Sequence, residues 1–366
     1  MVELRNITGA LLIDATAAFL NGSGLETGEN KNEVAIKTFN EKVNGKLERV
    51  PYVSAQAWRR WLRDTSNEEN SWKPSELRAI DSSKQKAEAE KNTDENEATK
   101  KKNTAKIATE LNPVDYPEDD LFGYMKSGSG SEESIQRTSP FKSSILKGIK
   151  NMRATNVDKA FVHLKEGTPL PYNTQFYSTH LEGFFNLEYY RLGVYDNLAS
   201  RQELSQELVT AHKDKFDESK IPYGAKFFPR YTLKDAEQKR KVHASGLLKG
   251  LSFLRGGAKQ AAFGSDVSPK VLILAGMQSA NPVFNNIFIG TGERPALNID
   301  ALLQIKEDYK ERLATPIYLG FRTGYLIGHY NNEFVSEEKM KELLNDGFVI
   351  DSPIGVVKQF NEKYLK

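Results

Sequence analysis

The sequence of 366 residues contains no cysteine. Disulfides, thiolate metal sites and cysteine nucleophiles are therefore excluded, and a reducing compartment is the expected surroundings. No apolar run approaches the roughly 20 residues that a membrane-spanning helix needs. The apolar run 10–20 is broken by Asp14 and has no basic lead-in, so it does not resemble a signal peptide. We expect a soluble, cytoplasmic protein without a membrane partner.

Common catalytic motifs are also missing. The sequence has no H-E-x-x-H, no G-x-S-x-G and no G-x-G-x-x-G. Its histidines are too far apart for local metal-ligand spacing, and they are His163, His180, His212, His243 and His329. We expect no enzyme activity, no metal and no cofactor.

Residues 81–106 include no Val, Ile, Leu, Met, Phe, Trp or Tyr. Such a segment cannot bury enough surface to offset its ordering entropy, so we expect a disordered insertion. Residues 64–120 carry 15 acidic and 9 basic side chains, whereas the other positions hold 34 acidic and 42 basic ones. A basic body with one acidic tract is typical of nucleic-acid binders, although many ordinary enzymes share it.

The sequence is otherwise rich in core-forming residues, with 39% hydrophobic residues, 19 Phe and 15 Tyr. This length suits one core with large insertions, or two modest domains. Hydrophobic patterning predicts strands at 4–13, 135–145, 175–190 and 269–275, and helices at 54–64, 233–254, 298–313 and 336–344. The first six elements run β-α-β-β-α-β, the order of a ferredoxin-like, RRM-type sheet. We therefore predict an α/β (α+β) fold with insertions around that sheet.

The helix at 54–64 is the most informative local feature. One face carries Gln56, Arg59, Arg60 and Arg63. The opposite face carries Ala55, Trp58, Trp61 and Leu62, which should pack on the sheet. Ser54 can cap the helix, and the arginines suit phosphate oxygens because guanidinium is permanently charged and bidentate. A solvated face that pairs with acids elsewhere is an equally good interpretation.

Two further segments admit alternative interpretations. In Arg-Gly-Gly-Ala-Lys-Gln at 255–260, the glycines either let the backbone approach a ligand or end the preceding helix. The acidic run 118–120 could hold Mg²⁺, but acids at a helix start more often interact with the helix dipole. Phe122 and Met125, which follow it, are more often core residues than ligand contacts.

Six segments in this order resemble one known family. They are LLIDATAAFLNG at 11–22, VPYVSAQAWRRWLRD at 50–64, DDLFGYM at 119–125, RTSPFKSS at 137–144, NTQFYSTHLEGFFNLEYYRLGVY at 173–195 and RGGAKQAAFG at 255–264. The family is the "Cas seven" backbone subunit of type I CRISPR surveillance complexes (Cascade), in its Cst/DevR, type I-B branch.

The resemblance implies an RRM-like palm, a finger-like insertion and a thumb-like arm. The corresponding ranges are 1–63 and 135–290 for the palm, about 145–172 for the thumb within it, 64–134 for the insertion, and 291–366 for a C-terminal helical extension. It also implies partners: a CRISPR guide RNA, target DNA through that guide, other copies in a helical stack, and other Cascade subunits.

The resemblance further implies which residues contact RNA. Those carried over by motif are Asn21, Ser54, Gln56, Arg59, Arg60, Arg63, Gly256, Gly257, Lys259 and Gln260. Met125 corresponds to an apolar wedge. Met152, Arg153 and Phe161 are assigned to the thumb by position alone, and Met152 and Phe161 should then be exposed in an isolated monomer.

Two other functions remain open. Related backbone subunits of type III complexes cut target RNA with an aspartate in a palm loop, and Asp14 is the only acid near the end of the first predicted strand. The chain could also be a free-standing single-stranded RNA-binding protein.

Overall fold

A computed structural model describes residues 2–25, 33–43, 45–80, 106–128, 134–150, 152–162, 170–199 and 201–366. The chain divides into two compact units. Unit 1 comprises Met1–Ser71, Phe141–Tyr190 and Ala244–Lys366, and unit 2 comprises Trp72–Pro140 and Arg191–His243. Residues 191–243 thus group with the insertion, and 291–366 group with unit 1. The names palm, finger and thumb stay predictions. The expected disordered tract 81–106 lies outside the described residues, except for Lys106.

Unit 1 is built on one large sheet. Its strands, in spatial order, are β24 (Phe348–Asp351), β21 (Ile317–Phe321), β18 (Val271–Met277), β1 (Asn6–Ala18), β13 (Leu170–Leu187), β11 (Leu146–Gly148), β5 (Lys46–Val53) and β4 (Thr38–Val43). β10 (Phe141–Ser143) also pairs with β13. The central order β18-β1-β13-β10 is antiparallel throughout. The predicted mixed α/β fold is confirmed.

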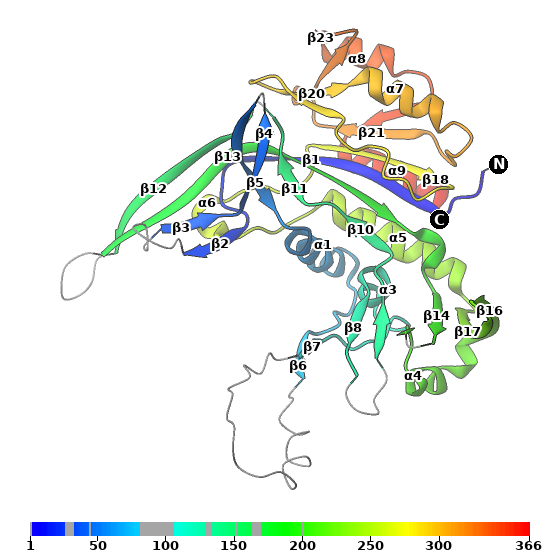
Figure 1. The fold of residues 1–366 in the computed structure, drawn as a ribbon. Coiled ribbons are helices and arrows are strands. Elements are labelled where there is room, and N and C mark those ends of the chain that lie inside the picture. The colour runs from blue at the N-terminus through cyan, green and yellow to red at the C-terminus, as the bar shows by residue number, and fades with distance from the viewer. Residues whose placement is uncertain are drawn as a thin grey trace. The chain divides into compact units, whose positions relative to one another are not determined.

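The two central strands are buried because both faces of the sheet are covered. Every residue of β18 is buried, as are most of β1. Figure 1 shows helices α1 (Ala55–Asn70) and α5 (Ala236–Ser252) on one side of these strands, and β20 (Pro295–Asn298), α7 (Ile299–Asp308) and α8 (Glu337–Leu343) on the other. Continuous apolar runs such as VLILA are typical of strands covered in this way.

Helix α1 is anchored to the sheet by its apolar face, as predicted. Trp58 and Leu62 are fully buried. The indole N–H of Trp58 donates to the carbonyl of Ser144 at 2.7 Å, and its ring meets that of Phe141 edge to face at 5.8 Å. The helix extends to Asn70, beyond the predicted end at 64.

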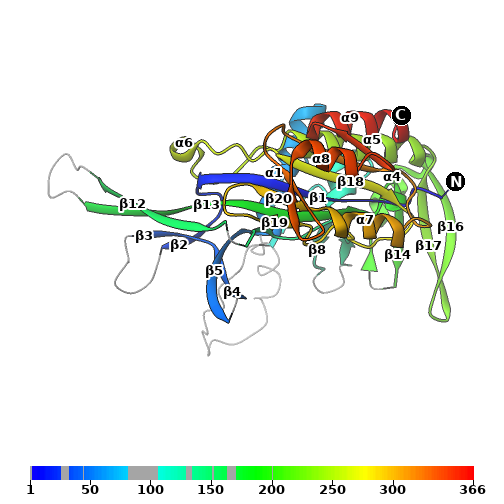
Figure 2. The same cartoon turned by 90° about the horizontal axis from the view of Figure 1, so that it is seen from above.

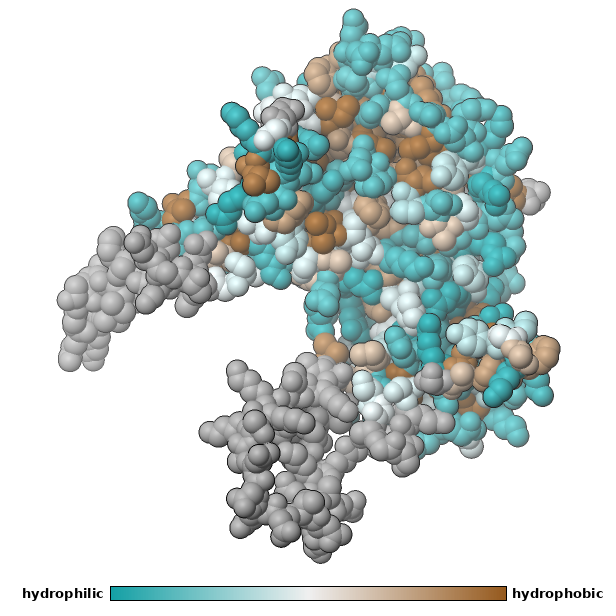
Figure 3. Space-filling view, viewed as in Figure 1, coloured by the Kyte–Doolittle hydropathy of each residue, from teal (hydrophilic) through white to brown (hydrophobic). Residues whose placement is uncertain are grey.

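Residues 291–366, expected to be a helical extension, contain both strands and helices. Helices α7, α8 and α9 (Pro353–Tyr364) alternate with β21, β24 and a small sheet of β19 (Phe288–Gly290), β20, β22 (Ile327–Tyr330) and β23 (Glu333–Val335). Phe284, Leu297, Leu302 and Met340 pack with residues of β18 in one core cluster. Figure 3 shows hydrophobic residues gathered among hydrophilic ones where β20, α7 and β21 lie. Residues 291–366 are therefore part of the core of unit 1.

An arm extends from this sheet. It consists of β12 (Ala154–Val162) and residues 170–178 of β13, paired antiparallel from Ala154↔Ser178 to Val162↔Leu170. Residues 154–160 are all exposed, and Figures 1 and 2 show the two strands reaching away from the rest of unit 1. The arm lies in the range predicted for the thumb.

Unit 2 has its own sheet, in the order β16 (Phe216–Tyr223), β17 (Lys226–Leu233), β14 (Val194–Leu198), β15 (Arg201–Gln202), β9 (Ile135–Arg137) and β8 (Tyr124–Lys126). Helices α3 (Pro117–Phe122) and α4 (Gln206–Ala211) belong to it. The predicted strand 135–145 is wrong as one element: β9 ends at Arg137 and β10 begins at Phe141. Pro140 lies between them and cannot donate to a strand ladder.

No helix in the described ranges has the length and apolarity that crossing a membrane would require.

Candidate nucleic-acid interface

Asn21, which follows β1, lies beside Ser54, which precedes α1. Oδ1 of Asn21 accepts a hydrogen bond from the backbone N–H of Ser54 at 3.0 Å. Oγ of Ser54 accepts one from the backbone N–H of Ala57 at 3.3 Å, so Ser54 is the N-cap of α1, as predicted. The positive end of the helix dipole therefore lies beside Asn21.

The glycine loop packs against the same place. Gly256 and Gly257 have φ values of 151° and 105°. A Cβ on Gly256 would lie 2.2 Å from Cγ of Trp61, and one on Gly257 would lie 2.8 Å from Cδ2 of Leu20. Helix α5 already ends at Ser252, so these glycines are not its C-cap. They let the loop approach α1 and the residue before Asn21, and we call this meeting of three segments the helix–loop junction.

The arginines of α1 differ in their surroundings. Arg59 is mostly buried, and its Nη1 donates to the carbonyl of Phe141 at 2.6 Å. Burial, and then the charge of Arg63, lower the pKa of Arg59. Arg60 is exposed and pairs with Asp64 at 2.8 Å, whereas Arg63 is half-buried and Gln56 is exposed. The predicted face is therefore split: Arg59 belongs to the interior, and the other three remain nearer to solvent.

Lys259 joins the glycine loop to the part of β13 that lies in the arm. Its Nζ donates to Oη of Tyr172 at 2.8 Å and to Oγ1 of Thr174 at 2.9 Å. The ammonium also lies 4.8 Å and 5.2 Å from the ring centres of Tyr172 and Phe19. The hydrogen bond from Lys259 lowers the pKa of the Tyr172 hydroxyl. Gln260 is turned inward too, because its amide donates to the carbonyl of Gly256.

Residues 15–293 match the model of a family described as "CRISPR-associated negative auto-regulator DevR/Csa2". The match covers about three quarters of the sequence and includes every segment of the helix–loop junction. The chain belongs to the DevR/Csa2 family. No curated protein matches it.

One solved structure shares the fold of this DevR/Csa2-family chain. A chain of a "CRISPR RNA-guided surveillance complex, pre-nicking" superposes with a TM-score of 0.53 at 11% identity, over 98% of this chain and 99% of that chain. A chain of a "CRISPR RNA-guided surveillance complex" gives a TM-score of 0.48 at 11% identity, over 98% of both chains.

The residues assigned to the thumb by position are placed differently from the expectation. Met152 is half-buried and packs against the core cluster of unit 1, so the expectation of an exposed Met152 is wrong. Arg153 is only 9% exposed and forms ion pairs with Glu41 and Glu48, both at 2.9 Å. RNA could reach its guanidinium only by displacing these carboxylates. The side chain of Phe161 lies outside the described residues.

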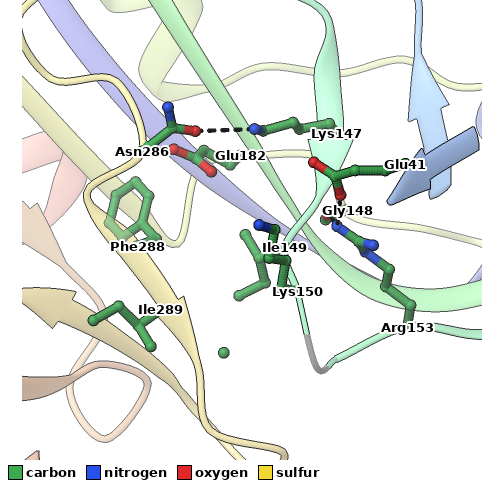
Figure 4. A pocket seen from close by; sticks show the side chains of 11 residues that line it. Glu41, Lys147, Gly148, Ile149, Lys150, Arg153, Glu182, Asn286, Phe288 and Ile289 are labelled. Carbon is green, nitrogen blue, oxygen red and sulfur yellow. Dashed lines mark hydrogen bonds and ion pairs between the residues drawn. The ribbon is translucent and has the colours of Figure 1, made fainter. Parts of the chain in front are cut away.

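Arg153 also lines a cavity of about 480 Å³ below the arm (Figure 4). Nζ of Lys147 donates to Oδ1 of Asn286 at 2.9 Å across its rim. Glu182, on its wall, is 5% exposed, and its Oε1 has no hydrogen-bond partner among the described residues. Burial raises the pKa of Glu182, despite the charge of Lys147 and the backbone N–H of Asn286.

The acids of α3 have protein partners in unit 2. Asp119 accepts hydrogen bonds from Oγ of Ser75 at 2.9 Å and from the N–H of Asn112 at 3.0 Å. Asp120 pairs with Arg137 at 2.6 Å and with His243 at 2.9 Å. These contacts give the acidic run a structural role in place of the metal site considered above. No metal-holding group of three or more His, Asp or Glu occurs in the described part of the chain.

The two apolar residues near that run have opposite environments. Phe122 is buried, as expected for a core residue. Met125 on β8 is 59% exposed, so the general expectation of a core methionine is wrong. Exposure is compatible with the wedge implied by the family resemblance, which stays a prediction.

Asp14, the residue considered for nuclease chemistry, lies near the end of β1 opposite His180 of β13. Its Oδ1 accepts hydrogen bonds from the N–H and the hydroxyl of Thr16, at 3.1 and 2.6 Å. These bonds lie beside the irregularity in the pairing of β1 with β13 between Ala15 and Ala18.

Sequence reasoning missed the residues that complete the junction: Phe19, Leu20, Tyr172 and Thr174. Leu20 follows an apolar run, and Tyr172 and Thr174 lie more than 80 residues before Lys259 in the chain. Tyr172 and Thr174 are two residues apart, and this spacing was the one local signal that their side chains share a face of a strand.

Proposed function

We propose that the chain is a non-catalytic backbone subunit of a type I-B CRISPR Cascade complex, which polymerises along the guide RNA and holds its sugar-phosphate backbone. The observation that carries the proposal is the helix–loop junction. Residues predicted to contact RNA come from segments 11–22, 50–64 and 255–264, and they meet at the N-terminus of α1. Membership of a CRISPR-associated family supports the same function.

The chemistry of the junction suits phosphate. Arg59 and Arg63 are close enough for Arg63 to lower the pKa of Arg59. Arg60, on the same helix, is exposed and can offer its guanidinium to a phosphate in two parallel hydrogen bonds. The first N–H groups of α1 have no acceptors within the helix and add a positive dipole end. Such contacts hold RNA without reading its bases, and the bases stay free to pair with target DNA.

The arm supports the proposed polymerisation. Residues 154–160 are exposed on a two-stranded extension, and an edge strand of this kind is available to a neighbouring copy or to RNA. We expect RNA-bound assemblies to grow by whole subunits as the RNA is lengthened, and RNA-free protein to stay smaller. Light scattering with RNAs of increasing length measures this. An unchanged mass at every length would contradict polymerisation.

Substitution of the accessible arginines tests the RNA contact. Arg60→Ala with Arg63→Ala should weaken RNA binding to a similar extent for any sequence. The slope of log K against log salt should fall by about 1.4, because each phosphate contact to single-stranded nucleic acid contributes roughly 0.7. Titrations at several salt concentrations measure both.

Arg49→Ala is the matched control, since Arg49 is an exposed arginine of β5 in the same unit whose guanidinium contacts Thr38. Its binding and salt slope should match those of the unchanged chain. Equal losses for Arg49→Ala and for the α1 pair would mean that net charge, and not the junction, holds RNA.

A non-catalytic role makes its own prediction. RNA incubated with the purified chain and Mg²⁺ or Mn²⁺ should stay intact. Cleavage that disappears with Asp14→Asn would overturn this part of the proposal and favour the nuclease alternative.

A further inference from the structure

The hairpin of β16 and β17 in unit 2 has one buried end and one free end. At the buried end, Phe216, Tyr231 and Leu233 pack in the core of this unit with Tyr195. The rings of Phe216 and Tyr231 lie 5.8 Å apart. The strands then run in register to Tyr223↔Lys226, where Gly224, with φ of 61°, closes the turn. Figure 2 shows this turn at the free end of a long two-stranded projection.

The free end of the hairpin also carries large aromatic residues, and there they are exposed to solvent. Tyr223 is 59% exposed and Phe227 is 69% exposed. Phe228 meets Tyr223 edge to face, with ring centres 6.1 Å apart. Pairing places Tyr223 and Phe228 on one face of the hairpin and Phe227 on the other. Large exposed aromatics on a well-anchored element indicate a binding surface.

The charge of this tip has one sign. Residues 219–229 contain Lys220 and Lys226 and no acidic residue. Neither lysine forms an ion pair with any described residue. The partner should therefore be anionic and should offer flat apolar surfaces to the aromatic rings.

Two prolines limit how a protein could occupy the tip. Pro222 lies on β16 and Pro229 on β17. Each lacks the N–H that a further strand would need, so edge-to-edge pairing with a second copy of the hairpin is disfavoured.

We propose that this tip binds single-stranded nucleic acid, with Tyr223 and Phe227 stacking on bases and Lys220 and Lys226 contacting phosphates. Aromatic platforms interleaved with basic residues are how proteins hold single strands without sequence preference. The site is separate from the helix–loop junction of unit 1 and does not depend on the function proposed for it.

The tip should not distinguish RNA from DNA. Residues 220–229 include no Asn, Gln, Ser, Thr, Asp or Glu, which are the side chains suited to reading a 2′-hydroxyl. Oligo(dT) and oligo(U) of equal length should therefore contact it equally well.

Ultraviolet cross-linking to the full chain locates the contact. Oligo(dT) and oligo(U) of about 12 nucleotides should both cross-link to the tryptic peptides 221–226 and 227–230, because trypsin cuts after Lys220, Lys226 and Arg230. The cross-links should persist in the Arg60→Ala, Arg63→Ala variant, whose defect concerns unit 1. Absence of cross-links in both peptides with both oligonucleotides would overturn the proposal.

Affinity measurements provide the second arm. Tyr223→Ser and Phe227→Ser should each weaken oligo(dT) binding by about tenfold, as expected for loss of one stacked base. Phe334→Ser is the matched control, because Phe334 is a 55% exposed aromatic on β23 of unit 1. Unchanged affinity in the hairpin variants, with a changed oligomeric state in RNA-free protein, would show a protein-binding surface and refute the assignment.

Discussion

Arginines occupy two contrasting environments in this protein. In unit 2, Arg137 is fully buried and forms ion pairs with Asp120 at 2.6 Å and Glu203 at 2.8 Å. Its remaining N–H groups donate to the carbonyls of Val194 and Arg191, each at 3.0 Å. In unit 1, by contrast, Arg60 of α1 is exposed and forms an ion pair with Asp64 at 2.8 Å near solvent.

The difference teaches how to interpret a basic residue. Arg137 is stabilised by acceptors from its own unit and has no donor to spare for a ligand. Arg60 has about half of its side chain exposed, so its guanidinium is accessible to an anion in solvent. Exposure of the guanidinium, more than the count of arginines, makes a basic residue available to a phosphate.

The largest expected effect comes from removing Arg137. Arg137→Met should destabilise unit 2 by about 3–5 kcal/mol, because it leaves two buried carboxylates without their countercharge. Urea unfolding at pH 7 measures the loss. A loss below about 1 kcal/mol would equate Arg137 with a surface arginine and remove the contrast.

The same variant has a defined pH dependence. Burial alone would raise the pKa of Asp120, but Arg137 and His243 hold it below its ordinary value of 3.8. Its contribution to stability is therefore complete above pH 3.8 and is lost as the pH falls through the lower pKa of the folded state. The difference between the unchanged chain and Arg137→Met should shrink below pH 3.8, and unfolding curves across the acid range test this.

The next effect concerns the glycine loop. Gly256→Ala should cost about 1–3 kcal/mol and weaken RNA binding, because its Cβ would lie 2.2 Å from Trp61 and displace the loop from α1. Gly264→Ala is the matched control: its φ is also positive, at 56°, but no atom lies within 4 Å of the added Cβ. Equal RNA affinity in both variants would show that the loop need not contact α1.

A smaller effect on stability is expected for a buried carboxylate that has no ion-pair partner among the described residues. Glu182 is buried, as Asp120 is, but it forms no ion pair with any described residue, and burial raises its pKa above 4.5. The charged form therefore disfavours folding above that raised pKa, and this penalty disappears as the pH falls below 4.5. Glu182→Gln should stabilise unit 1 by about 1 kcal/mol at pH 7 and by less at pH 4. A loss of stability at pH 7 would show that the carboxylate has a favourable partner.

The smallest effect is that of Arg60→Met on folding. An exposed i,i+4 pair typically contributes less than about 1 kcal/mol, so the melting temperature should barely change. The same substitution combined with Arg63→Ala should still reduce RNA affinity. A large loss of stability would place Arg60 with Arg137 among the structural arginines.

The sequence predicted those elements whose signal is local. The strand β18 and the long helix α5 are found close to their predicted bounds, and β1 and α1 begin close to where predicted but end five and six residues later. The sequence predicted one strand at 135–145, where the structure has β9 and β10. The two strands belong to different units, and residues 138–140 connect them. The strands β21 and β24 were missed because they are only 5 and 4 residues long.

Much of the candidate site was also predictable, but its geometry was not. Asn21, Ser54 and the glycine pair were identified from their segments, and they meet in the structure. Their mutual contacts depend on pairing between β1, β13 and β18, which no local pattern encodes. The contact of Lys259 with Tyr172 was also unforeseen, as were the two carboxylates of Arg153, which the pairing of β4 with β5 places opposite each other.

One strand belongs to both the core sheet and the arm. β13 is 18 residues long, so it spans about 60 Å at roughly 3.3 Å per residue. Its second half pairs with β1 up to Ala18↔Tyr177, and its first half pairs with β12 from Ser178. There is no break between the two halves, and the arm has further contacts along its length, through the pairing of Asn173 and Thr174 with β3 (Glu33–Ile36) and through Lys259. Movement of the arm relative to the sheet therefore requires either bending of a continuous hydrogen-bonded strand or loss of these contacts.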